Sequence, residues 1–379
     1  MDEALDFHKK YKGKIQISLK APLDKDTLKL AYTPGVAEVS LAIAQDKKLT
    51  NLYTNRGNTV AIITDGSAVL GLGNIGPEAA LPVMEGKAAL FKKFGNVDAI
   101  PIILNTQDTE KIIKSVKAIF SSFAGINLED ISAPRCFEIE EKLDRELPIP
   151  VFHDDQHGTA IVVLAALINS LRVVDKNKEA KIVISGAGAA GTAITKLLLS
   201  YGFKNLAVCD SKAIIESSRE DLNGAKQEIA KVTSPNIKGI CPLAYAGADV
   251  FIGVSAPNIL SPEMVKSMAK YPIIFALANP NPEIKPDLAK KAGARVVATG
   301  RSDYPNQINN VLAFPGVFRG ALDSGAKSIT HKMKIAAALA LADYVKNPNE
   351  NNIIPSVFDD NVSKIVAESV INESKKLYK

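Results

Sequence analysis

Short apolar runs alternate along the chain with longer segments in which apolar residues recur at helical spacing. The short runs, several of them rich in β-branched residues, predict buried strands at about 58–65, 98–104, 125–128, 149–152, 181–185, 205–208, 248–254, 271–278 and 294–298. Helical spacing is found at about 78–94, 108–123, 134–143 and 157–174. Strands that alternate with helices are typical of α/β proteins with parallel sheets.

A domain boundary is expected near residue 156, where a long apolar helix follows the fourth predicted strand. We expect residues 1–156 to form an N-terminal α/β domain. Residues 157–379 are expected to form a doubly wound parallel sheet of the Rossmann type, followed by C-terminal helices.

A glycine-rich turn follows the strand at 181–185. Its sequence, G-A-G-A-A-G, has the pattern G-x-G-x-x-G, which lets a pyrophosphate approach backbone N–H groups at a helix N-terminus. The next strand is followed by an acid near the spacing at which a carboxylate hydrogen-bonds the adenosine ribose. The pattern predicts a dinucleotide site, against the simpler alternative of a turn between strand and helix. Its candidate residues are Gly186, Gly188, Ala189, Ala190, Gly191 and Asp210.

The acid of this site also bears on which cofactor binds. A carboxylate at Asp210 should repel a 2′-phosphate and therefore favours NAD. Lys212, two residues further on, partly offsets that repulsion, so NADP stays possible.

Polar residues follow the later strands of the second sheet, where ligands collect in open parallel sheets. Ser255, Asn279 and the run at 299–302 lie at these strand ends. We expect them near the nicotinamide ribose and the substrate. Asn309 and Asn310 lie in a loop or at the start of a helix.

Two strands of the N-terminal domain are followed by paired acids. Glu129 and Asp130 follow the third predicted strand, and Asp154 and Asp155 follow the fourth. Because the carboxyl ends of parallel strands share one edge of a sheet, these carboxylates are expected to converge. Hard oxygen ligands of this kind suit Mg²⁺ or Mn²⁺. The alternative, which is the better one for either pair alone, is a helix cap or a solvated turn.

Two more residues carry candidate chemistry. Lys87 has apolar neighbours at helical spacing, so it either extends to solvent or is desolvated with a lowered pKa, as in a general base. Tyr32 precedes Thr33 and Pro34, which predict a helix start. From this segment alone, Tyr32 is better explained as a packing residue than as a group that points into a cleft.

A second G-x-G-x-x-G lies at 71–76. No acid closes the strand that follows its helix, so the pattern indicates a loop that lines the active site and not a second cofactor site.

Composition excludes several classes of function. The 379 residues carry a net charge of +5 without a basic stripe interleaved with aromatics, so no nucleic-acid partner is expected. The three cysteines are widely spaced, and the chain lacks an apolar signal segment and any run of about 18 apolar residues. We therefore expect a cytoplasmic protein without a membrane partner.

A series of motifs resembles those of the malic enzymes, specifically the short bacterial or archaeal form. They are A-Y-T-P-G at 31, T-D-G-S with L-G-L-G-N-I-G at 64–76, P-V-M-E-G-K at 82, N-L-E-D at 127, F-H-D-D-Q-H-G-T at 152, the glycine turn at 186, L-A-N-P at 277 and N-N-V-L-A-F-P-G at 309. The motifs follow the family's order over nearly the whole chain. The resemblance is therefore far more specific than any single motif.

The resemblance implies roles for the acids in the N-terminal domain. Glu129, Asp130 and Asp155 match the family's metal ligands. Asp154 matches an acid beside the catalytic lysine.

The resemblance also implies which residues act as general acid and general base and which contact the substrate. Lys87 matches the general base and Tyr32 the general acid. Asn279 and Asn310, with Asn309 beside them, match residues that hold malate and the nicotinamide end of the cofactor.

The implied reaction is the oxidative decarboxylation of L-malate to pyruvate and CO₂ by a homodimer that uses NAD(P) and Mg²⁺ or Mn²⁺. The lysine takes the hydroxyl proton as hydride leaves C2, and after loss of CO₂ the tyrosine protonates C3.

One departure from the family's pattern concerns the substrate. Larger malic enzymes carry an arginine before L-G-L-G that clamps a malate carboxylate, whereas this chain has Ser67, Ala68 and Val69. We expect backbone N–H groups of the loop at 71–76, or Asn279 and Asn310, to hold the carboxylate.

Three other functions stay open. A metal-independent amino-acid dehydrogenase has a similar pair of domains and uses a lysine. A dinucleotide-sensing module would bind the cofactor without catalysis, but would not need the two acid pairs and Lys87. A malolactic enzyme would release lactate without net reduction of the cofactor.

Overall fold

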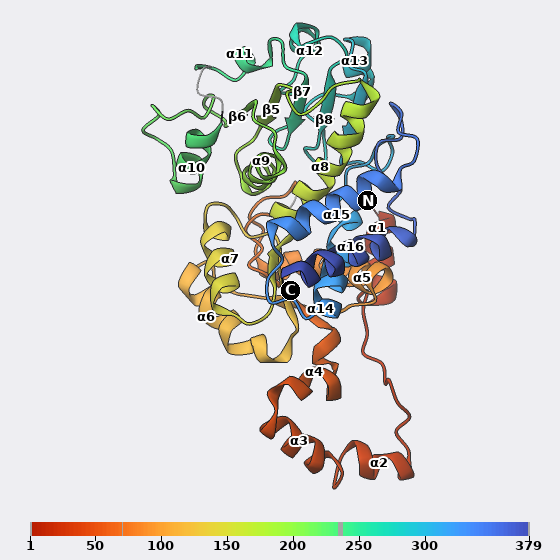
Figure 1. The fold of residues 1–379 in the computed structure, drawn as a ribbon. Coiled ribbons are helices and arrows are strands. Elements are labelled where there is room, and N and C mark those ends of the chain that lie inside the picture. Colours follow the sequence, from red (N-terminus) through yellow and green to blue (C-terminus); the bar gives the residue numbers. More distant parts are fainter. Residues whose placement is uncertain (1, 70, 234–237, 378–379) are drawn as a thin grey trace.

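The computed structural model describes residues 2–69, 71–233 and 238–377. Two parallel sheets follow one another along the long axis of the molecule (Figure 1). The first has the order β2-β1-β3-β4, with β1 (Thr59–Thr64), β2 (Asp98–Ile103), β3 (Gly125–Leu128) and β4 (Val151–His153). The second has the order β6-β5-β7-β8-β9, with β5 (Ile182–Ser185), β6 (Leu206–Cys209), β7 (Val250–Gly253), β8 (Ile273–Ala276) and β9 (Val296–Thr299). Each predicted strand and the α/β fold class are confirmed.

Helices connect the strands within each sheet. Those of the first sheet are α5 (Pro77–Gly95), α6 (Thr109–Ile119) and α7 (Arg135–Glu146). Those of the second are α9 (Ala189–Tyr201), α10 (Gly224–Val232), α11 (Pro242–Tyr245), α12 (Pro262–Ser267) and α13 (Pro286–Lys291). All residues of the strands in the second sheet are buried, which explains why these strands read as continuous apolar runs.

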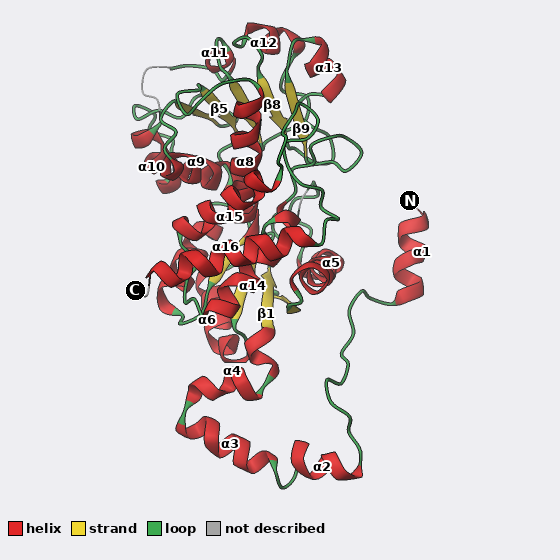
Figure 2. Ribbon diagram, turned by 45° about the vertical axis from the view of Figure 1, so that its right-hand side comes forward, coloured by secondary structure: helices red, strands yellow, loops and turns green. Residues whose placement is uncertain are grey.

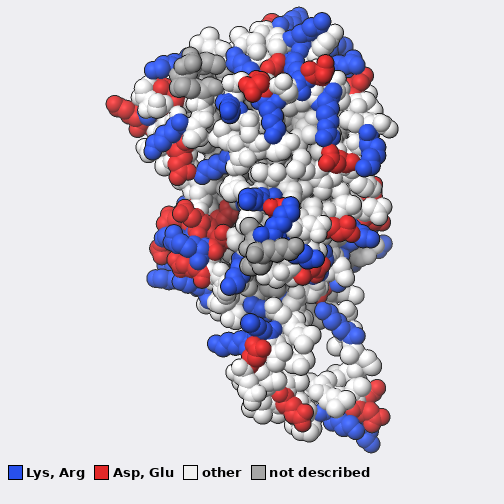
Figure 3. Space-filling view, viewed as in Figure 1, with Lys and Arg blue, Asp and Glu red and all other residues white. Residues whose placement is uncertain are grey.

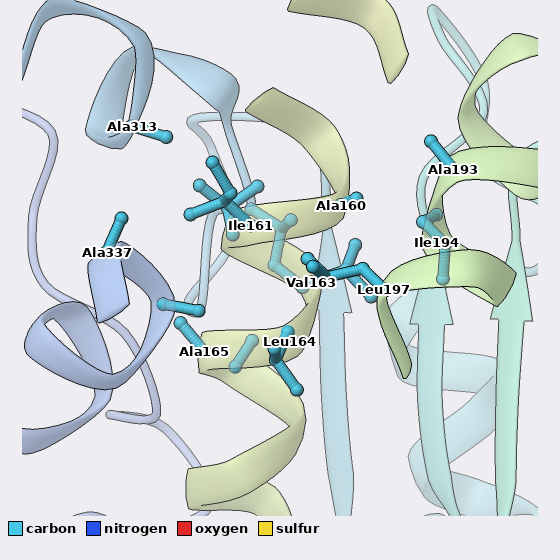
Figure 4. Close-up of a cluster of buried hydrophobic side chains, with 14 of the residues drawn as sticks. Ala160, Ile161, Val163, Leu164, Ala165, Ala193, Ile194, Leu197, Ala313 and Ala337 are labelled. Atoms are coloured by element: carbon cyan, nitrogen blue, oxygen red, sulfur yellow. The ribbon is translucent and has the colours of Figure 1, made fainter. Parts of the chain in front are cut away.

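Helix α8 (Asp154–Val173) joins the two sheets and forms the centre of the main core. Val163 faces Leu197 of α9, and other side chains of α8 face Ala337 on the opposite side (Figure 4). Among the described helices, α8 alone is long and apolar enough to cross a membrane, but 78% of that window is buried inside the protein. The apolar side chains of α8 therefore pack in the core of the protein.

Three helices follow the second sheet in the chain, and the first of them packs on the first sheet. They are α14 (Phe314–Ser324), α15 (His331–Tyr344) and α16 (Asn361–Leu377). The rings of Phe91 and Phe314 lie 4.7 Å apart, and those of Phe152 and Phe318 lie 5.7 Å apart. The aromatic residues of α14 thus extend the core beneath α5 and β4, while α15 packs on α8 and α9.

Most of the N-terminal segment lies outside the two sheets, although Lys14, shortly after α1, donates to Glu85 and Pro82 of α5. It contains α1 (Asp2–Tyr11), α2 (Lys25–Ala31), α3 (Val36–Gln45) and α4 (Thr50–Tyr53), with short 3₁₀ helices at Lys47–Leu49 and Asn55–Asn58. Another 3₁₀ helix, Phe120–Ser122, lies between α6 and β3. Figures 1 and 2 show α2 and α3 projecting from one end of the molecule. Helices α2, α3 and α4 bury no residue, although they carry large apolar side chains such as Leu30, Leu41 and Leu52.

The helix start predicted at Thr33 and Pro34 is wrong. The N–H of Tyr32 donates to the carbonyl of Leu28, so Tyr32 is the C-cap of α2, and α3 begins only at Val36. Thr33 and Pro34 form the turn between the two helices because the hydrogen bonds of α2 already extend to Tyr32.

Candidate active site

Three carboxylates converge at the edge of the first sheet. Glu129 and Asp130 follow β3, and Asp155 lies in the first turn of α8. One carboxylate oxygen from each lies within 4.8 Å of the others. The sequence predicted this convergence from the neighbouring ends of β3 and β4, which are paired in parallel. Helix α8 begins at Asp154, three residues earlier than expected, and so presents both of its acids from one helical turn.

The electrostatics of these acids favour a bound cation. Burial raises the pKa of Glu129, and burial together with the charges of Asp155 and Glu129 raises the pKa of Asp130 to about 9. The N–H of Asp130 donates to Asp155 Oδ2 over 2.9 Å, while Asp130 Oδ2 is buried without a partner among the described residues. Three converging hard oxygen donors fit a divalent ion such as Mg²⁺ or Mn²⁺.

Lys87 reaches this cluster from α5. The residue is 7% exposed, so its ammonium does not extend to solvent. Its Nζ donates to Asp154 Oδ2 and lies 2.8 Å from Glu129 Oε1 and 4.2 Å from the ring centre of Phe314. Burial lowers the pKa of Lys87, but the charges of Asp154 and Glu129 outweigh burial, and the net direction is upward. The expectation of a lowered pKa is therefore wrong for the protein without a cation at the acids.

Asp154 is held between Lys87 and the segment that follows β9. Asn310 donates to Asp154 Oδ2 over 2.6 Å, and burial raises the pKa of Asp154 to about 7. A Cβ at Gly158 would overlap Asp154 Oδ1 and would lie 3.2 Å from Asn310. Gly158, which sequence reasoning did not identify, thus allows Asn310 to approach Asp154.

The alternative left open for the two asparagines is decided by local structure. Asn309 caps the 3₁₀ helix at Asn310–Leu312, and its Oδ1 accepts from the N–H of Val311 over 2.9 Å. The pair lies at a helix start, and of the two side chains that of Asn310 reaches the acid cluster.

The glycines after β5 each have a different physical role. Gly186 has φ +116°, and a Cβ there would lie 2.7 Å from the carbonyl oxygen of Val254. A Cβ at Gly191 would overlap the carbonyl oxygen of Gly186, so this glycine permits close packing of helix and strand. Gly188 has open space around it, just before Ala189 and Ala190 begin α9. This geometry suits a pyrophosphate above Gly188.

A buried acid supports the remaining cofactor residues. Glu283 is fully buried and accepts hydrogen bonds from the N–H groups of Ser255 (3.1 Å) and Ala278 (3.0 Å). The Ser255 hydroxyl lies 3.3 Å from that of Ser185. Glu283 therefore holds the two strand ends that carry Ser255 and Asn279. No sequence motif indicated Glu283, because its role depends on the folded proximity of β7 and β8.

The glycine-rich loop of the N-terminal domain lies against Asn279. A Cβ at Gly71 would lie 3.2 Å from the carbonyl oxygen of Asn279, so the two domains meet at this point. The loop thus lies beside a candidate substrate residue.

Arg135 of α7 supplies a positive charge near this loop. It donates to Asp65 Oδ2 and to the hydroxyls of Ser67 and Ser132, each over 2.9 Å. Arg135 therefore links the segment after β1, which includes Ser67, to the segment after Asp130, which includes Ser132. Sequence reasoning missed it because Asp65 and Ser67 lie 70 and 68 positions before it in the chain.

Asp210 is paired with two cations. Arg219 contacts it through both terminal nitrogens, at 2.9 and 3.1 Å, and Lys226 contacts it at 2.6 Å. These groups lower the pKa of Asp210 against the opposing effect of burial. Lys212, the cation named from the sequence, pairs instead with Asp221 at 2.7 Å. The cations that offset the charge of Asp210 are therefore Arg219 and Lys226.

Tyr32 is not with the other candidate residues. It is 68% exposed at the end of α2, on the N-terminal segment that projects from the molecule (Figure 2). Within one chain, the candidate general acid is separated from Lys87 and the acids. Its exposure also argues against the packing role considered from the sequence.

Comparison with known proteins follows the same division of the chain. Residues 12–144 match the family of malic enzyme N-terminal domains, and residues 156–375 match the family of malic enzyme NAD-binding domains.

Among similar proteins, the NAD-dependent malic enzyme of Geobacillus stearothermophilus is 57% identical over 95% of this chain and 76% of its own length. The bifunctional malic/malolactic enzyme of Bacillus subtilis is 55% identical over 97% of this chain and 92% of its own length. The crystal structure of the NAD-dependent malic enzyme of Thermotoga maritima has a TM-score of 0.94 and 52% identity, covering 97% of this chain and 98% of that one.

Proposed function

The chain belongs to the malic enzyme family, and from that premise we propose that its acid cluster, Lys87 and glycine turn carry out one reaction. That reaction is the oxidative decarboxylation of L-malate to pyruvate and CO₂ with reduction of NAD(P) and dependence on a divalent metal. The observation that carries the proposal is the contact of buried Lys87 with Glu129 and Asp154, beside the three converging carboxylates.

We propose that Glu129, Asp130 and Asp155 hold Mg²⁺ or Mn²⁺. These acids would place the ion beside the substrate, where it would supply electrostatic stabilisation of negative charge, and a cofactor held at the glycine turn would supply the hydride acceptor. The unpartnered Oδ2 of Asp130 and the raised pKa of that acid support this assignment.

Lys87 is proposed to take the proton of the C2 hydroxyl. A lysine can act as a general base only as the neutral amine. Asp154 and Glu129 raise the pKa of Lys87 and so favour its charged form. A divalent cation bound by the acids would offset their negative charge and so lower the pKa of Lys87. Burial would then favour the neutral amine. Asp154 orients the lysine, and Asn310 holds Asp154 through its side-chain amide.

This chain lacks the arginine with which larger family members bind a carboxylate of the substrate. We propose that the loop at 71–76, Asn279 and Asn310 hold malate. The contact between Gly71 and Asn279 supports this proposal because it brings the loop and a polar strand end together.

Tyr32 is proposed to protonate C3, and to do so in the active site of a second chain in a homodimer. Helices α2 and α3 expose apolar side chains and bury none, so they lack packing partners within the described part of their own chain. A two-fold dimer would supply a surface for them and would bring each Tyr32 to the partner's acid cluster.

For the cofactor we propose NAD, with NADP also accepted. Asp210 favours ribose hydroxyls, while Arg219 and Lys226 beside it offer donors to a 2′-phosphate. Ser255 and Asn279 are proposed to contact the nicotinamide end.

One assay tests the proposed function. Malate, Mn²⁺ and NAD or NADP are supplied, reduced cofactor is followed, and the organic product is identified. Pyruvate with stoichiometric reduced cofactor supports the proposal. Activity that survives EDTA with an amino acid as substrate would favour a metal-independent dehydrogenase instead.

A malolactic activity is the second candidate, because the Bacillus subtilis relative is named a bifunctional malic/malolactic enzyme. It would appear in the same assay as lactate without net reduction of the cofactor. A cytoplasmic location, and the lack of nucleic-acid and membrane partners, stay predictions.

A further inference from the structure

A cavity of about 330 Å³ lies between the two domains, apart from the candidate active site. Its walls come from α7, the first turns of α8, α9 and the start of α15. Gln156 and His157 line it, but the acids at 129, 130 and 155 and Lys87 are not among its described lining residues. A volume at the small end of ligand pockets suits a ligand with few heavy atoms.

Lys334 in α15 lines this cavity and is 8% exposed. Among the residues that the structure describes, its ammonium has neither a hydrogen-bond nor an ion-pair partner; its Nζ lies 5.7 Å from the ring centre of Phe152. Burial lowers the pKa of Lys334 to about 8, although Glu140 and Asp144 act in the opposite direction. The side chain is largely buried, and the unused donors of its ammonium face an open space.

The nearby acids already have donors of their own. Glu140 accepts from the N–H of His153 over 2.8 Å and from Gln156 Nε2 over 2.9 Å. Asp144 accepts from the hydroxyl of Ser328 over 3.0 Å. These acids balance the charge of the lysine at a distance, but neither binds it. Asp144 Oδ1 is buried without a hydrogen-bond partner among the described residues, so it is closed off from the cavity. The unmatched group that stays accessible from the cavity is the ammonium of Lys334, a donor.

The other groups on that side of the cavity also favour an anion. Thr330 caps α15, a helix of 14 residues, and both Thr330 and His331 line the cavity at its N-terminus. The positive end of the helix dipole lies there. Lys196 lines the cavity from α9, but it is paired at the surface with Glu228 at 2.8 Å.

We propose that this cavity binds a small carboxylate with a single negative charge, held by the ammonium of Lys334 and the N-terminus of α15. A dianion is disfavoured because Glu140 and Asp144 face the same space and acidic side chains gather over α7 (Figure 3). The inference concerns a second site, so it stands or falls independently of the proposed function.

Titration calorimetry of acetate into the full-length protein tests the proposal. We expect Lys334→Met to weaken acetate binding about tenfold or more, because it removes a charged hydrogen bond while keeping the apolar stem. Lys334→Arg should retain most of the affinity. Lys196→Met, a change in the same cavity at a lysine that already has a partner, should alter the affinity by less than about twofold. Succinate and phosphate serve as dianionic comparisons.

Site-resolved labelling gives a second readout that does not depend on the folding of any variant. Reductive methylation of the wild-type protein, followed by mass spectrometry, should show that acetate slows modification of Lys334 and not of Lys196. Equal acetate affinity in wild type and folded Lys334→Met would overturn the proposal. So would a lack of protection at Lys334, or tighter binding of succinate or phosphate than of acetate at this site.

Discussion

Lys87 Nζ lies 2.8 Å from Glu129 Oε1, so the candidate base and a candidate metal ligand are in direct contact. The pair is buried, and both members also interact electrostatically with Asp154 and Asp155. The protonation of the lysine is therefore tied to the charge on the acids, and changes on either side should affect the same reaction step.

Lys87→Ala should lower the rate of hydride transfer from malate by about 10²- to 10⁴-fold, because no group remains to take the C2 hydroxyl proton. Malate should still bind. Single-turnover stopped-flow measurement of reduced cofactor checks the rate, and calorimetry checks binding. Lys92→Ala is the control, since Lys92 lies on the same helix but is exposed and paired with Asp98. Oxidation near the wild-type rate in Lys87→Ala would show that the base is another residue.

Asp155→Asn should abolish the stabilisation of the protein by Mn²⁺. A ligand that binds only the native state raises Tm by mass action, and this variant loses one of three carboxylates. Without metal, the variant should be more stable than wild type, because burial and the charge of Asp155 both disfavour the ionised form of Asp130. Thermal unfolding with and without Mn²⁺ measures both effects. Glu110→Gln, at an exposed position of α6, is the control, and an unchanged Mn²⁺ effect in Asp155→Asn would contradict the metal assignment.

Tyr32→Phe should transfer hydride normally but protonate the enol of pyruvate slowly. Added oxaloacetate should then be reduced to malate more often than it is decarboxylated, which product analysis measures. Tyr53→Phe, at another exposed tyrosine of the N-terminal segment, is the control. An unchanged product ratio would exclude Tyr32 as the acid.

Mixing two variants impaired at different steps tests whether the tyrosine acts in a partner chain. Dimers formed from Tyr32→Phe and Lys87→Ala chains should form pyruvate faster than either variant alone, since one of their two sites then contains both wild-type residues. No recovery after verified subunit exchange would show that the tyrosine and lysine of one site come from the same chain.

Arg219→Ala should lower kcat/KM for NADP relative to NAD by about tenfold or more, since a guanidinium is a strong partner for a phosphate. The ratio of kcat/KM for NADP to kcat/KM for NAD is compared between variants, because a loss of activity that affects both cofactors equally leaves this ratio unchanged. Lys212→Ala is the control because Lys212 pairs with Asp221 and not with Asp210. A ratio that stays constant, or moves toward NADP, would remove Arg219 from cofactor selection.

Gly188→Ala and Gly191→Ala should separate cofactor binding from folding. A methyl group at Gly188 meets no protein atom within 4 Å, so this variant should keep its Tm and bind NAD more weakly. A methyl group at Gly191 would overlap the carbonyl oxygen of Gly186, so that variant should lose stability as well. Thermal unfolding and NAD titration distinguish the two. Unimpaired NAD binding by Gly188→Ala would argue against a pyrophosphate at this turn.

The sequence alone determined the strands, the fold class and the convergence of the acids. Apolar runs with β-branched residues specify buried strands locally, and parallel strands bring their carboxyl ends to one edge. The positions of Glu129, Asp130 and Asp155 could be predicted because each lies within a few residues of a strand end. The same local logic identified the glycines at 186, 188 and 191.

Tertiary structure decided what depends on contacts between distant segments. Glu283, Arg135 and Gly158 have roles only because other parts of the chain fold against them, and no local pattern records such contacts. The pKa of Lys87 likewise depends on a balance between burial and two acids that lie on other elements. Tyr32 is the clearest case: its motif is local, but its separation from the acid cluster became visible only when α2 was placed outside the packed body of the chain.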